Sequence, residues 1–329
     1  MLAEERSVVS GCRYLAVDLE QATGEMAARI ANPSNQDAWL PNTTVIGFCR
    51  KSAQSLPALT RKLLPLVDLV ADGTTRNELL DSALNNLQSN PMASTALVQL
   101  LRSNHKMSVE DGLLLESLTY SALQHGAEFL AWLRQRRAPN RESRESRLPV
   151  TVNRDGDRLT ITLNRADKHN AFSASMREGL CEALALAETD YSIGQVLLQG
   201  AGPSFCAGGD LEEFGLARDA ALAHLTRTTR SPARLIDRIS KRTTAQLHGA
   251  CIGAGIEMTA FAGHVTAATN AYFALPEVGF GLVPGAGGTV SIPRRIGRHR
   301  AALLGLSGQR IDAALALEWG LVDELSNPR

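Results

Sequence analysis

Apolar residues between residues 75 and 137 recur every three or four positions, the spacing that places them on one face of an α-helix. Thr75–Gln88 and Ser94–Ser103 each show this pattern, and a third amphipathic stretch begins at Ser108, a residue type suited to capping a helix N-terminus. We expect this third helix to continue to about Arg137, with Gly126 as a weak point inside it. The residues before this stretch contain few strand signals and are divided by Pro33, Pro41, Pro57 and Pro65. The pattern therefore predicts a mainly helical N-terminal region over residues 1–137.

The composition changes abruptly at residues 136–149, RRAPNRESRESRLP, which contain almost no apolar side chains. Alternating Arg, Glu, Ser and Pro are typical of a solvated linker, and a basic clamp for phosphate is the alternative interpretation. We expect a linker over residues 138–149, followed by a second domain over residues 150–329.

Beyond this linker the pattern alternates between strand and helix. Leu159, Ile161 and Leu163 alternate with polar residues, as in a half-buried strand, and an amphipathic helix follows over residues 173–187. Short apolar runs predict further strands at residues 196–198, 245–248, 265–268 and 272–275. Strands that alternate with helices predict an α/β domain.

Charge and cysteine content narrow the class of protein. Lys+Arg and Asp+Glu number 34 each, with 16 of each before residue 148, so neither half carries the basic excess typical of nucleic-acid binding. The five cysteines are far apart and include no Cys-x-x-Cys pair, which favours a reducing compartment over a disulfide framework or a zinc site. Glu4 and Glu5 stand where a secretory signal would need basic residues, and no uncharged stretch is typical of a membrane span. We expect a soluble cytoplasmic protein without membrane or nucleic-acid partners.

Three glycine-containing turns follow predicted strands, at Ala207–Asp210, Gly253–Glu257 and Pro284–Thr289. Such turns let backbone N–H groups approach a negatively charged ligand. They do not match a dinucleotide fingerprint, because Met258 and Val290 occupy the position of the third glycine, and no Gly-Lys-Ser/Thr follows to form a P-loop. Each turn alone is also compatible with a purely structural role.

The order and spacing of these turns along the chain are more informative than each turn alone. The segments involved are Asn164–Ala171, Phe205–Leu211, His248–Glu257, Leu275–Thr289 and Trp319–Asp323. Together they resemble the enoyl-CoA hydratase/isomerase (crotonase) family over about residues 149–325. The resemblance implies an α/β fold with a crotonase-like (ββα) spiral core, here preceded by the mainly helical N-terminal region.

The resemblance also implies a chemistry. Members of the family bind acyl thioesters of coenzyme A and stabilise an enolate-like oxyanion with two backbone N–H groups, which correspond here to Ala207 and Ala254. In the hydratases of the family, glutamates at the positions of Glu257 and Glu277 hold a water and deliver its parts across the Cα=Cβ bond. Both glutamates are flanked by apolar residues, which favours a raised pKa and general acid/base work. Cys206 and Cys251 are interpreted as small buried residues rather than nucleophiles.

Binding of coenzyme A is expected along two segments that resemble the adenine-facing loops of the family. The residues concerned are Lys168, Asn170, Ala171, Gly208, Asp210 and Leu211. The resemblance implies no metal and no cofactor other than coenzyme A as part of the substrate. It also implies a homo-oligomer, a trimer or hexamer.

Two features depart from the family pattern. About 147 residues precede the core where typical members have almost none, and the helices that usually follow the Gly320–Asp323 segment are missing before Arg329. We hypothesise that the N-terminal helices cover the site or build the oligomer instead. The leading prediction is an acyl-CoA hydratase or dehydratase acting on a 2-enoyl-CoA. The alternatives are an enoyl-CoA isomerase, another reaction of the superfamily such as that of the arylacetyl-CoA dioxygenases, and a non-catalytic acyl-CoA-binding protein.

Overall fold

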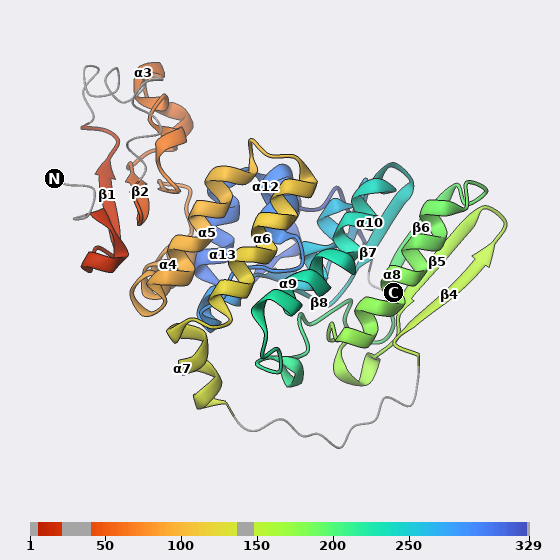
Figure 1. The fold of residues 1–329 in the computed structure, drawn as a ribbon. Helices are drawn as coiled ribbons and strands as arrows, with labels where there is room; N and C mark the ends of the chain where they lie inside the picture. The colour runs from red at the N-terminus through yellow and green to blue at the C-terminus, as the bar shows by residue number, and fades with distance from the viewer. Residues whose placement is uncertain (1–5, 22–40, 137–147, 328–329) are drawn as a thin grey trace.

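The structure is a computed structural model that describes residues 6–21, 41–136 and 148–327. It is a mixed α/β protein with three separate sheets (Figure 1). The largest sheet has six strands in the order β12-β9-β7-β6-β5-β4, and all neighbouring pairs are parallel except β5 with β4. Its strands are β4 (Val150–Asp155), β5 (Arg158–Leu163), β6 (Gln195–Gly200), β7 (Thr243–Leu247), β9 (His264–Ala268) and β12 (Glu324–Ser326).

A second sheet of three strands lies in the same half of the chain. β8 (Ala250–Ile252) pairs in parallel with β10 (Tyr272–Ala274), which pairs antiparallel with β11 (Ile311–Asp312). Helices connect and cover these sheets: α8 (Ala174–Thr189), α9 (Ala220–Thr229), α10 (Pro232–Arg238), α11 (Ala254–Glu257), α12 (Gly288–Ile296), α13 (Arg298–Ser307) and α14 (Ala313–Trp319). The predicted α/β alternation is confirmed for this half, although β4, β8, β11 and β12 were not expected. Only Val150 of β4 is buried, and the remaining residues of this strand are exposed. The strand therefore lacks the alternation of buried and exposed positions by which strands are recognised.

The N-terminal region contains the expected helices and also an unexpected sheet. The helices are α3 (Ala58–Arg61), α4 (Asn77–Ser89), α5 (Pro91–Asn104), α6 (Val109–Leu123) and α7 (Ala127–Gln135). Ser108 caps α6 by accepting a hydrogen bond from the Asp111 N–H, as predicted. The expectation of one helix running from Ser108 to Arg137 is wrong, because the chain leaves the helix after Leu123 and α7 starts anew behind Gly126, whose φ and ψ are extended.

The sheet of the N-terminal region is small and entirely parallel. Its strands are β1 (Tyr14–Asp18), β2 (Thr44–Phe48) and β3 (Leu69–Ala71), in that order. The prediction of few strands in this part is therefore wrong. The prolines that divide the sequence lie outside these strands, and the buried run Thr44–Ile46 was the available strand signal.

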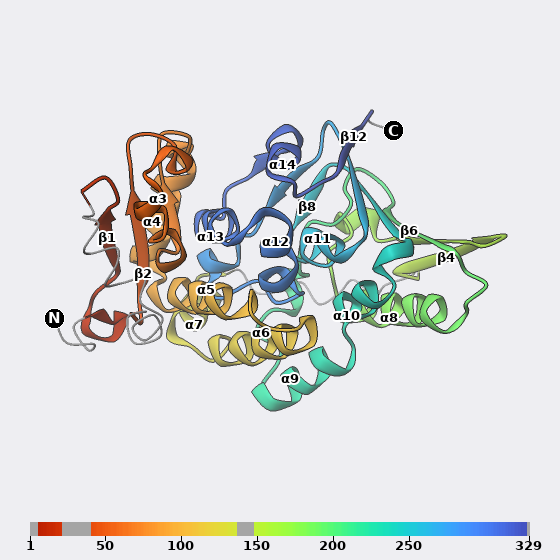
Figure 2. The same ribbon diagram turned by 90° about the horizontal axis from the view of Figure 1, so that it is seen from above.

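The helices before residue 137 share one hydrophobic core with the second half of the chain. Leu97 and Leu100 of α5 belong to the same buried cluster as Leu304 of α13. A Cβ built on Gly305 would lie 2.8 Å from Leu97 Cδ2, which shows how closely α5 and α13 approach. Figures 1 and 2 show α4, α5 and α6 lying against α12 and α13, with the N-terminal sheet at the far end of the molecule.

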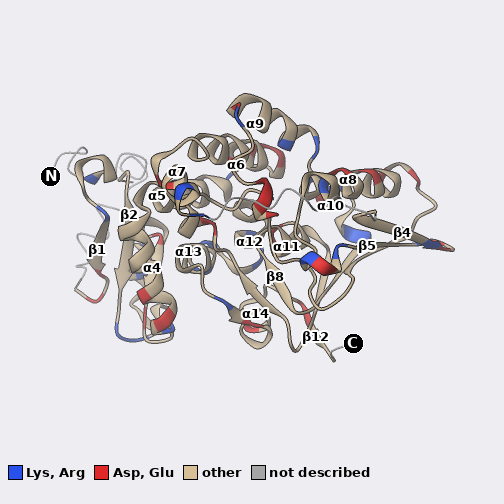
Figure 3. Cartoon of the chain, turned by 90° about the horizontal axis from the view of Figure 1, so that it is seen from below, with Lys and Arg blue, Asp and Glu red and all other residues tan. Residues whose placement is uncertain are grey.

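Most of the linker predicted at residues 138–149 lies outside the described residues, as do the N-terminal acidic residues Glu4 and Glu5. The positions of Lys and Arg and of Asp and Glu are distributed along the whole ribbon in Figure 3. Among the described helices, none is long and apolar enough to cross a membrane.

Candidate active site

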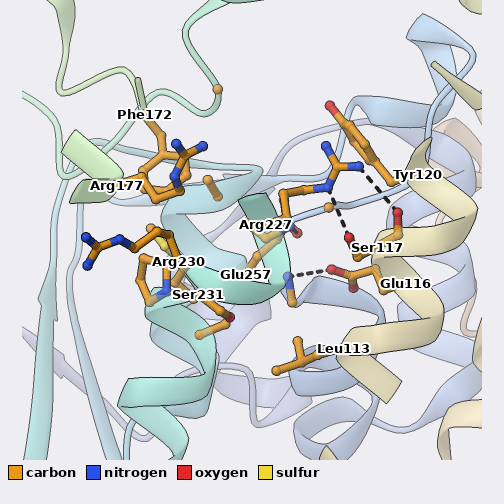
Figure 4. Close-up of a pocket in the computed structure, with 18 of the residues that line it drawn as sticks. Leu113, Glu116, Ser117, Tyr120, Phe172, Arg177, Arg227, Arg230, Ser231 and Glu257 are labelled. Carbon is orange, nitrogen blue, oxygen red and sulfur yellow. Dashed lines mark hydrogen bonds between the residues drawn. The ribbon is translucent and has the colours of Figure 1, made fainter. Parts of the chain in front are cut away.

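A pocket of about 220 Å³ lies between the α/β core and helix α6 of the N-terminal region (Figure 4). The core contributes residues from the glycine-containing turns, and the side chains of α6, α9 and the start of α10 form another wall. The residues that line the pocket include Glu116, Ser117, Tyr120, Gly209, Arg227, Ala254, Glu257 and Glu277. Glu257 and Glu277, which were predicted from sequence, therefore line the same pocket.

Glu257 and Glu277 are brought together by Gly253. Glu257 ends the short helix α11, and Glu277 begins a 3₁₀ turn (Glu277–Phe280) after β10. A Cβ built on Gly253 would lie 2.4 Å from Glu277 Oε1 and 3.6 Å from Glu257 Oε1. Gly253 also has φ +50° and ψ −122°, so only glycine fits this position sterically and conformationally.

The two carboxylates have different hydrogen-bond partners. Glu257 Oε2 accepts hydrogen bonds from the backbone N–H of Ala286 at 2.7 Å and of Gly288 at 3.0 Å. Glu277 Oε2 is buried and has no hydrogen-bond partner among the described residues. One glutamate is thus fixed by the protein, while the other presents an acceptor to the pocket.

Burial controls the protonation of both groups. Removal from water raises the pKa of Glu257 well above its usual range, and the charges of Glu277 and Glu116 raise it further. Burial raises the pKa of Glu277 to about 8, and Glu116 again adds to the shift. Such carboxyl groups retain or release a proton near neutral pH, as general acid/base chemistry requires.

Sequence reasoning missed Glu116, a third buried glutamate that reaches the site from α6. It accepts hydrogen bonds from the N–H of Gly287 at 2.7 Å and of Thr289 at 2.9 Å, and from the Thr289 hydroxyl at 2.6 Å. Burial raises the pKa of Glu116 to about 7 against these hydrogen bonds. Glu257 and Glu116 therefore bind alternate N–H groups along residues 286–289, where α12 begins. No periodicity marked Glu116 as a site residue, since it precedes the family-like segments and lies on a helix that is apolar on several faces.

Of the two N–H groups predicted to bind an oxyanion, that of Ala207 is hydrogen-bonded within the protein. The Ala207 N–H donates to the His169 carbonyl at 2.9 Å, and Ala207 does not line the pocket. Gly209 and Ala254 do line the pocket, and within the described part of the chain no acceptor is found for either N–H. The parallel bridge between Phe172 and Gly209 uses the Gly208 carbonyl and the Asp210 N–H, which leaves the Gly209 N–H unused.

Several residues expected to bind coenzyme A are engaged within the protein. The Asn170 amide accepts from the Arg165 N–H and donates to the carbonyls of Ala201 and Ser204, so it holds its own loop together. Lys168 Nζ lies 2.6 Å from Glu212 Oε2. Ala171 and Gly208 offer backbone groups to the same loops, Leu211 is 43% exposed, and Asp210 pairs with Arg165 at 2.9 Å beside the pocket. Contact of this set with coenzyme A stays a prediction.

The wall formed by α6 and α9 is polar. Arg227 of α9 donates to Ser117 Oγ at 3.2 Å, to Gln124 Oε1 at 3.3 Å and to Ser121 Oγ, and its guanidinium lies 4.8 Å from the centre of the Tyr120 ring. These contacts tie α9 to the N-terminal region, and Figure 4 shows Arg227 directed toward α6.

Cys206 and Cys251, which lie in the segments next to the site, are buried thiols. Burial raises the pKa of the Cys206 thiol to about 12 and that of Cys251 well above its usual range, which matches their interpretation as small buried residues. Within residues 6–21, 41–136 and 148–327, no group of three or more His, Cys, Asp or Glu side chains is arranged to hold a metal ion.

Comparisons with known proteins identify the class to which this fold and pocket belong. A sequence model of the enoyl-CoA hydratase/isomerase family matches residues 157–327. The chain belongs to the enoyl-CoA hydratase/isomerase, or crotonase, family, and the half of the chain that the model matches has the crotonase-like fold. The match leaves out α6, and with it Glu116 and Tyr120.

Individual relatives differ in their activities. The chain is 36% identical to the 1,2-epoxyphenylacetyl-CoA isomerase of Escherichia coli over 50% of its own length and 64% of that of the isomerase. It is also 36% identical to the 2,3-dehydroadipyl-CoA hydratase of the same organism, over 54% of this chain and 68% of the relative. The chain thus spans about two thirds of the length of these relatives.

Solved structures give the same picture. The structure of a Mycobacterium smegmatis enoyl-CoA hydratase superposes with a TM-score of 0.51 at 31% identity, covering 55% of this chain and 70% of that one. A protein from Thermobifida fusca, solved in complex with acetoacetyl-CoA, superposes with a TM-score of 0.51 at 25% identity, covering 58% of this chain and 78% of that one.

Proposed function

We propose that this protein is an acyl-CoA hydratase or dehydratase that adds water to a 2-enoyl-CoA thioester or removes it from the product. The observation that carries the proposal is the pairing of Glu257 and Glu277 in one pocket that Gly209 and Ala254 also line with unbonded N–H groups. Two carboxylates beside two free backbone donors suit a reaction in which negative charge develops on a thioester oxygen while a water is divided.

In the proposed reaction, the thioester oxygen accepts hydrogen bonds from the N–H groups of Gly209 and Ala254. A water donates to the unpartnered Glu277 Oε2 and also to Glu257, whose own Oε2 is fixed by Ala286 and Gly288. The water oxygen bonds to Cβ as one carboxylate takes its proton, and the enolate then receives a proton at Cα from the other carboxyl group. Burial and neighbouring carboxylates raise the pKa of both groups, so the pair retains the proton that the enolate receives at Cα.

Binding of coenzyme A is proposed on the side of the pocket formed by Phe172, Gly209 and Asp210. This side adjoins the Lys168–Ala171 loop, which resembles the adenine-facing segment of the family. The complex of the Thermobifida fusca relative with acetoacetyl-CoA supports an acyl-CoA ligand. No cofactor other than the coenzyme A of the substrate is proposed.

The test follows the ultraviolet absorbance of conjugated enoyl-CoA thioesters, with products identified by mass spectrometry. We expect loss of conjugation with a gain of one water, and a fall in kcat of about 10²–10⁴-fold in Glu257→Gln and Glu277→Gln. Glu188→Gln, a substitution on α8 outside the pocket, is the matched control. Full activity in both pocket variants would contradict the assigned roles.

Double-bond isomerisation is the second candidate, because it needs only one carboxylate to move a proton between carbons and because an isomerase is among the relatives. Products of unchanged mass, from a reaction that survives loss of one glutamate, would identify it. Binding of acyl-CoA without turnover of any thioester would identify a binding protein instead. The trimer or hexamer implied by the resemblance stays a prediction, which light scattering of the purified chain tests.

A further inference from the structure

The pocket wall formed by α6, α9 and the start of α10 is unusually polar for a site that would hold a hydrocarbon chain. Its members are Ser117, Tyr120, Gln124, Arg227, Thr228, Arg230, Ser231 and Arg234, with Leu113, Pro232 and Ala233 as apolar neighbours. Pockets for aliphatic groups are lined mainly by apolar side chains with a few polar groups. This wall carries hydroxyl and guanidinium groups instead.

Among the described residues, no carboxylate is in contact with Arg227, unlike the neighbouring Arg230 and Arg234 of this wall. Arg230 lies 2.9 Å from Glu178, and Arg234 lies 2.6 Å from Glu110. The acceptors of Arg227 are the hydroxyls of Ser117 and Ser121, the Ser117 carbonyl and the Gln124 amide, all of them neutral. A guanidinium has five N–H groups, so these four bonds leave one N–H on Nη1 for a ligand.

The contacts of Arg227 fix its orientation before any ligand binds. Its guanidinium is held by three residues of α6 and lies over the Tyr120 ring, so little side-chain freedom remains to be lost on binding. Burial lowers the pKa of Arg227, yet an arginine side chain stays charged at neutral pH. The wall therefore presents a pre-oriented positive charge that no protein carboxylate in contact with it neutralises.

We propose that Arg227 binds an anionic group, a carboxylate, on the acyl chain of the substrate. This inference rests on the proposed function, since it assigns the acyl class of the thioester that the same pocket would hold. Tyr120 lies beside Arg227 in the same pocket, and its hydroxyl offers a further hydrogen bond to a bound carboxylate. The substrate class is then the ω-carboxyacyl-CoA thioesters rather than unsubstituted fatty acyl-CoA.

A phosphate of coenzyme A is the other source of an anion with the same chemistry. The geometry favours the acyl chain, because Figure 4 shows Phe172 and Arg177 on one side of the pocket and Ser117, Tyr120 and Arg227 on the other. Glu257, Glu277 and the N–H groups of Gly209 and Ala254 line the same pocket as the residues of these two sides. Because coenzyme A is proposed to bind at the Phe172 side, the α6 side remains for the acyl chain.

The experiment measures binding of saturated thioesters by titration calorimetry, since these ligands cannot be hydrated. Adipyl-CoA and hexanoyl-CoA have the same chain length and differ in the terminal carboxylate. We expect adipyl-CoA to bind the full chain at least about tenfold more tightly, as suits one charge-assisted hydrogen bond. This preference should fall at high salt, because an ion pair is screened.

Variants locate the preference. In Arg227→Gln the preference for adipyl-CoA over hexanoyl-CoA should fall to about one, and Arg227→Lys should retain part of it because the charge remains. Arg238→Gln removes one positive charge from a residue that does not line the pocket and should keep the wild-type ratio. If the Arg227 variants fail to fold, the two ligands on the wild-type chain still provide the test.

Equal binding of the two thioesters to the wild-type chain would overturn the inference, as would a preference that survives Arg227→Gln. A loss of affinity in Arg227→Gln for free coenzyme A relative to dephospho-coenzyme A would assign the arginine to a phosphate and also overturn it. Failure of the proposed function has a different signature, because adipyl-CoA would then bind selectively while no enoyl-CoA is hydrated.

Discussion

At the scale of single residues, the candidate site depends on how buried carboxylates share a few backbone donors. Glu257 binds the N–H groups of Ala286 and Gly288, and Glu116 binds those of Gly287 and Thr289. The carboxylates of Glu257 and Glu116 thus bind the same turn, so a shift of this turn would displace both. Glu116 does not need to touch the substrate to influence the reaction, because it positions Glu257 and raises the pKa of both other glutamates.

We predict that Glu116→Gln shifts the turn at residues 286–289 and removes a negative charge near Glu257 and Glu277. Its amide group would face the N–H groups of Gly287 and Thr289, and we expect kcat to fall by about 10-fold to 100-fold as the turn shifts. Removal of the Glu116 charge should also lower the pKa of Glu257 and Glu277, so the pH–rate profile should move to lower pH. Glu110→Gln at the exposed start of α6 is the control. A fall in activity without a shifted profile would indicate a structural role alone.

The raised pKa values also predict how stability depends on pH. In the unfolded chain Glu277 releases its proton near pH 4.5, whereas in the folded protein it retains the proton until about pH 8. The folded state therefore binds more protons in this interval, and its contribution to stability falls as the pH rises through it. Glu277→Gln cannot ionise, so its melting temperature relative to wild type should increase steadily from pH 5 to pH 8. A constant difference across this range would contradict the raised pKa.

At the scale of secondary structure elements, helix α6 closes the site because the glycine-containing turns leave room for it. Gly285 lies against the ring of Tyr120, and a Cβ built there would come within 2.4 Å of the ring atom Cδ2. The guanidinium of Arg227 lies 4.8 Å from the centre of the same ring, so a displaced ring would also disturb Arg227. The sequence motif around Gly285 thus serves packing against α6 as well as the turn itself.

We predict that Gly285→Ala displaces α6 and destabilises the protein by about 1–3 kcal/mol, the usual cost of overpacking. Activity should fall with it, since Glu116 and Tyr120 move together on the helix. Gly279→Ala is the matched control, because a Cβ there would meet only Asn86 Oδ1 at 4.0 Å. Chemical denaturation and turnover of the same preparations provide the measurement, and equal effects of the two substitutions would refute the packing argument.

At the scale of the whole molecule, the N-terminal region is attached to the core by a buried ionic cluster as well as by apolar contacts. Arg102 of α5 binds Asp68 through Nε at 2.7 Å and Nη2 at 2.5 Å, and Arg298 of α13 lies 3.6 Å from the same carboxylate. Asp68 also accepts from the Val45 N–H in β2 at 2.8 Å. One carboxylate thereby joins the N-terminal sheet, α5 and the start of α13.

Asp68→Asn should leave two buried guanidinium groups without their counter-charge and cost about 3–5 kcal/mol of stability. Asp81→Asn at an exposed position of α4 is the control. Because both halves share one hydrophobic core, we expect urea denaturation of each variant to remain a single transition. Separate unfolding of the N-terminal region at lower urea would contradict a shared core.

Much of the fold followed from local pattern. The helices at 77–89, 91–104 and 174–189 and the strands β5, β6, β7, β9 and β10 lie where the sequence pattern placed them. β1, β2 and β3 escaped notice since they are short and lie between proline-containing segments, and β4 since it is mostly exposed on both faces. Gly126 is a helix boundary because its backbone conformation is extended. The low helix propensity of glycine alone does not decide whether a helix ends at such a residue or continues through it.

The sequence by itself determined the family and predicted Glu257 and Glu277 as a pair, because both depend on residue types at fixed local spacings. Only the tertiary structure decided that the His169 carbonyl occupies the Ala207 N–H while the Gly209 N–H lines the pocket. It also decided that Glu116, Tyr120 and Arg227 meet at one wall. Those residues are separated by up to about a hundred positions along the chain, and their proximity arises from helix packing, which no local pattern encodes.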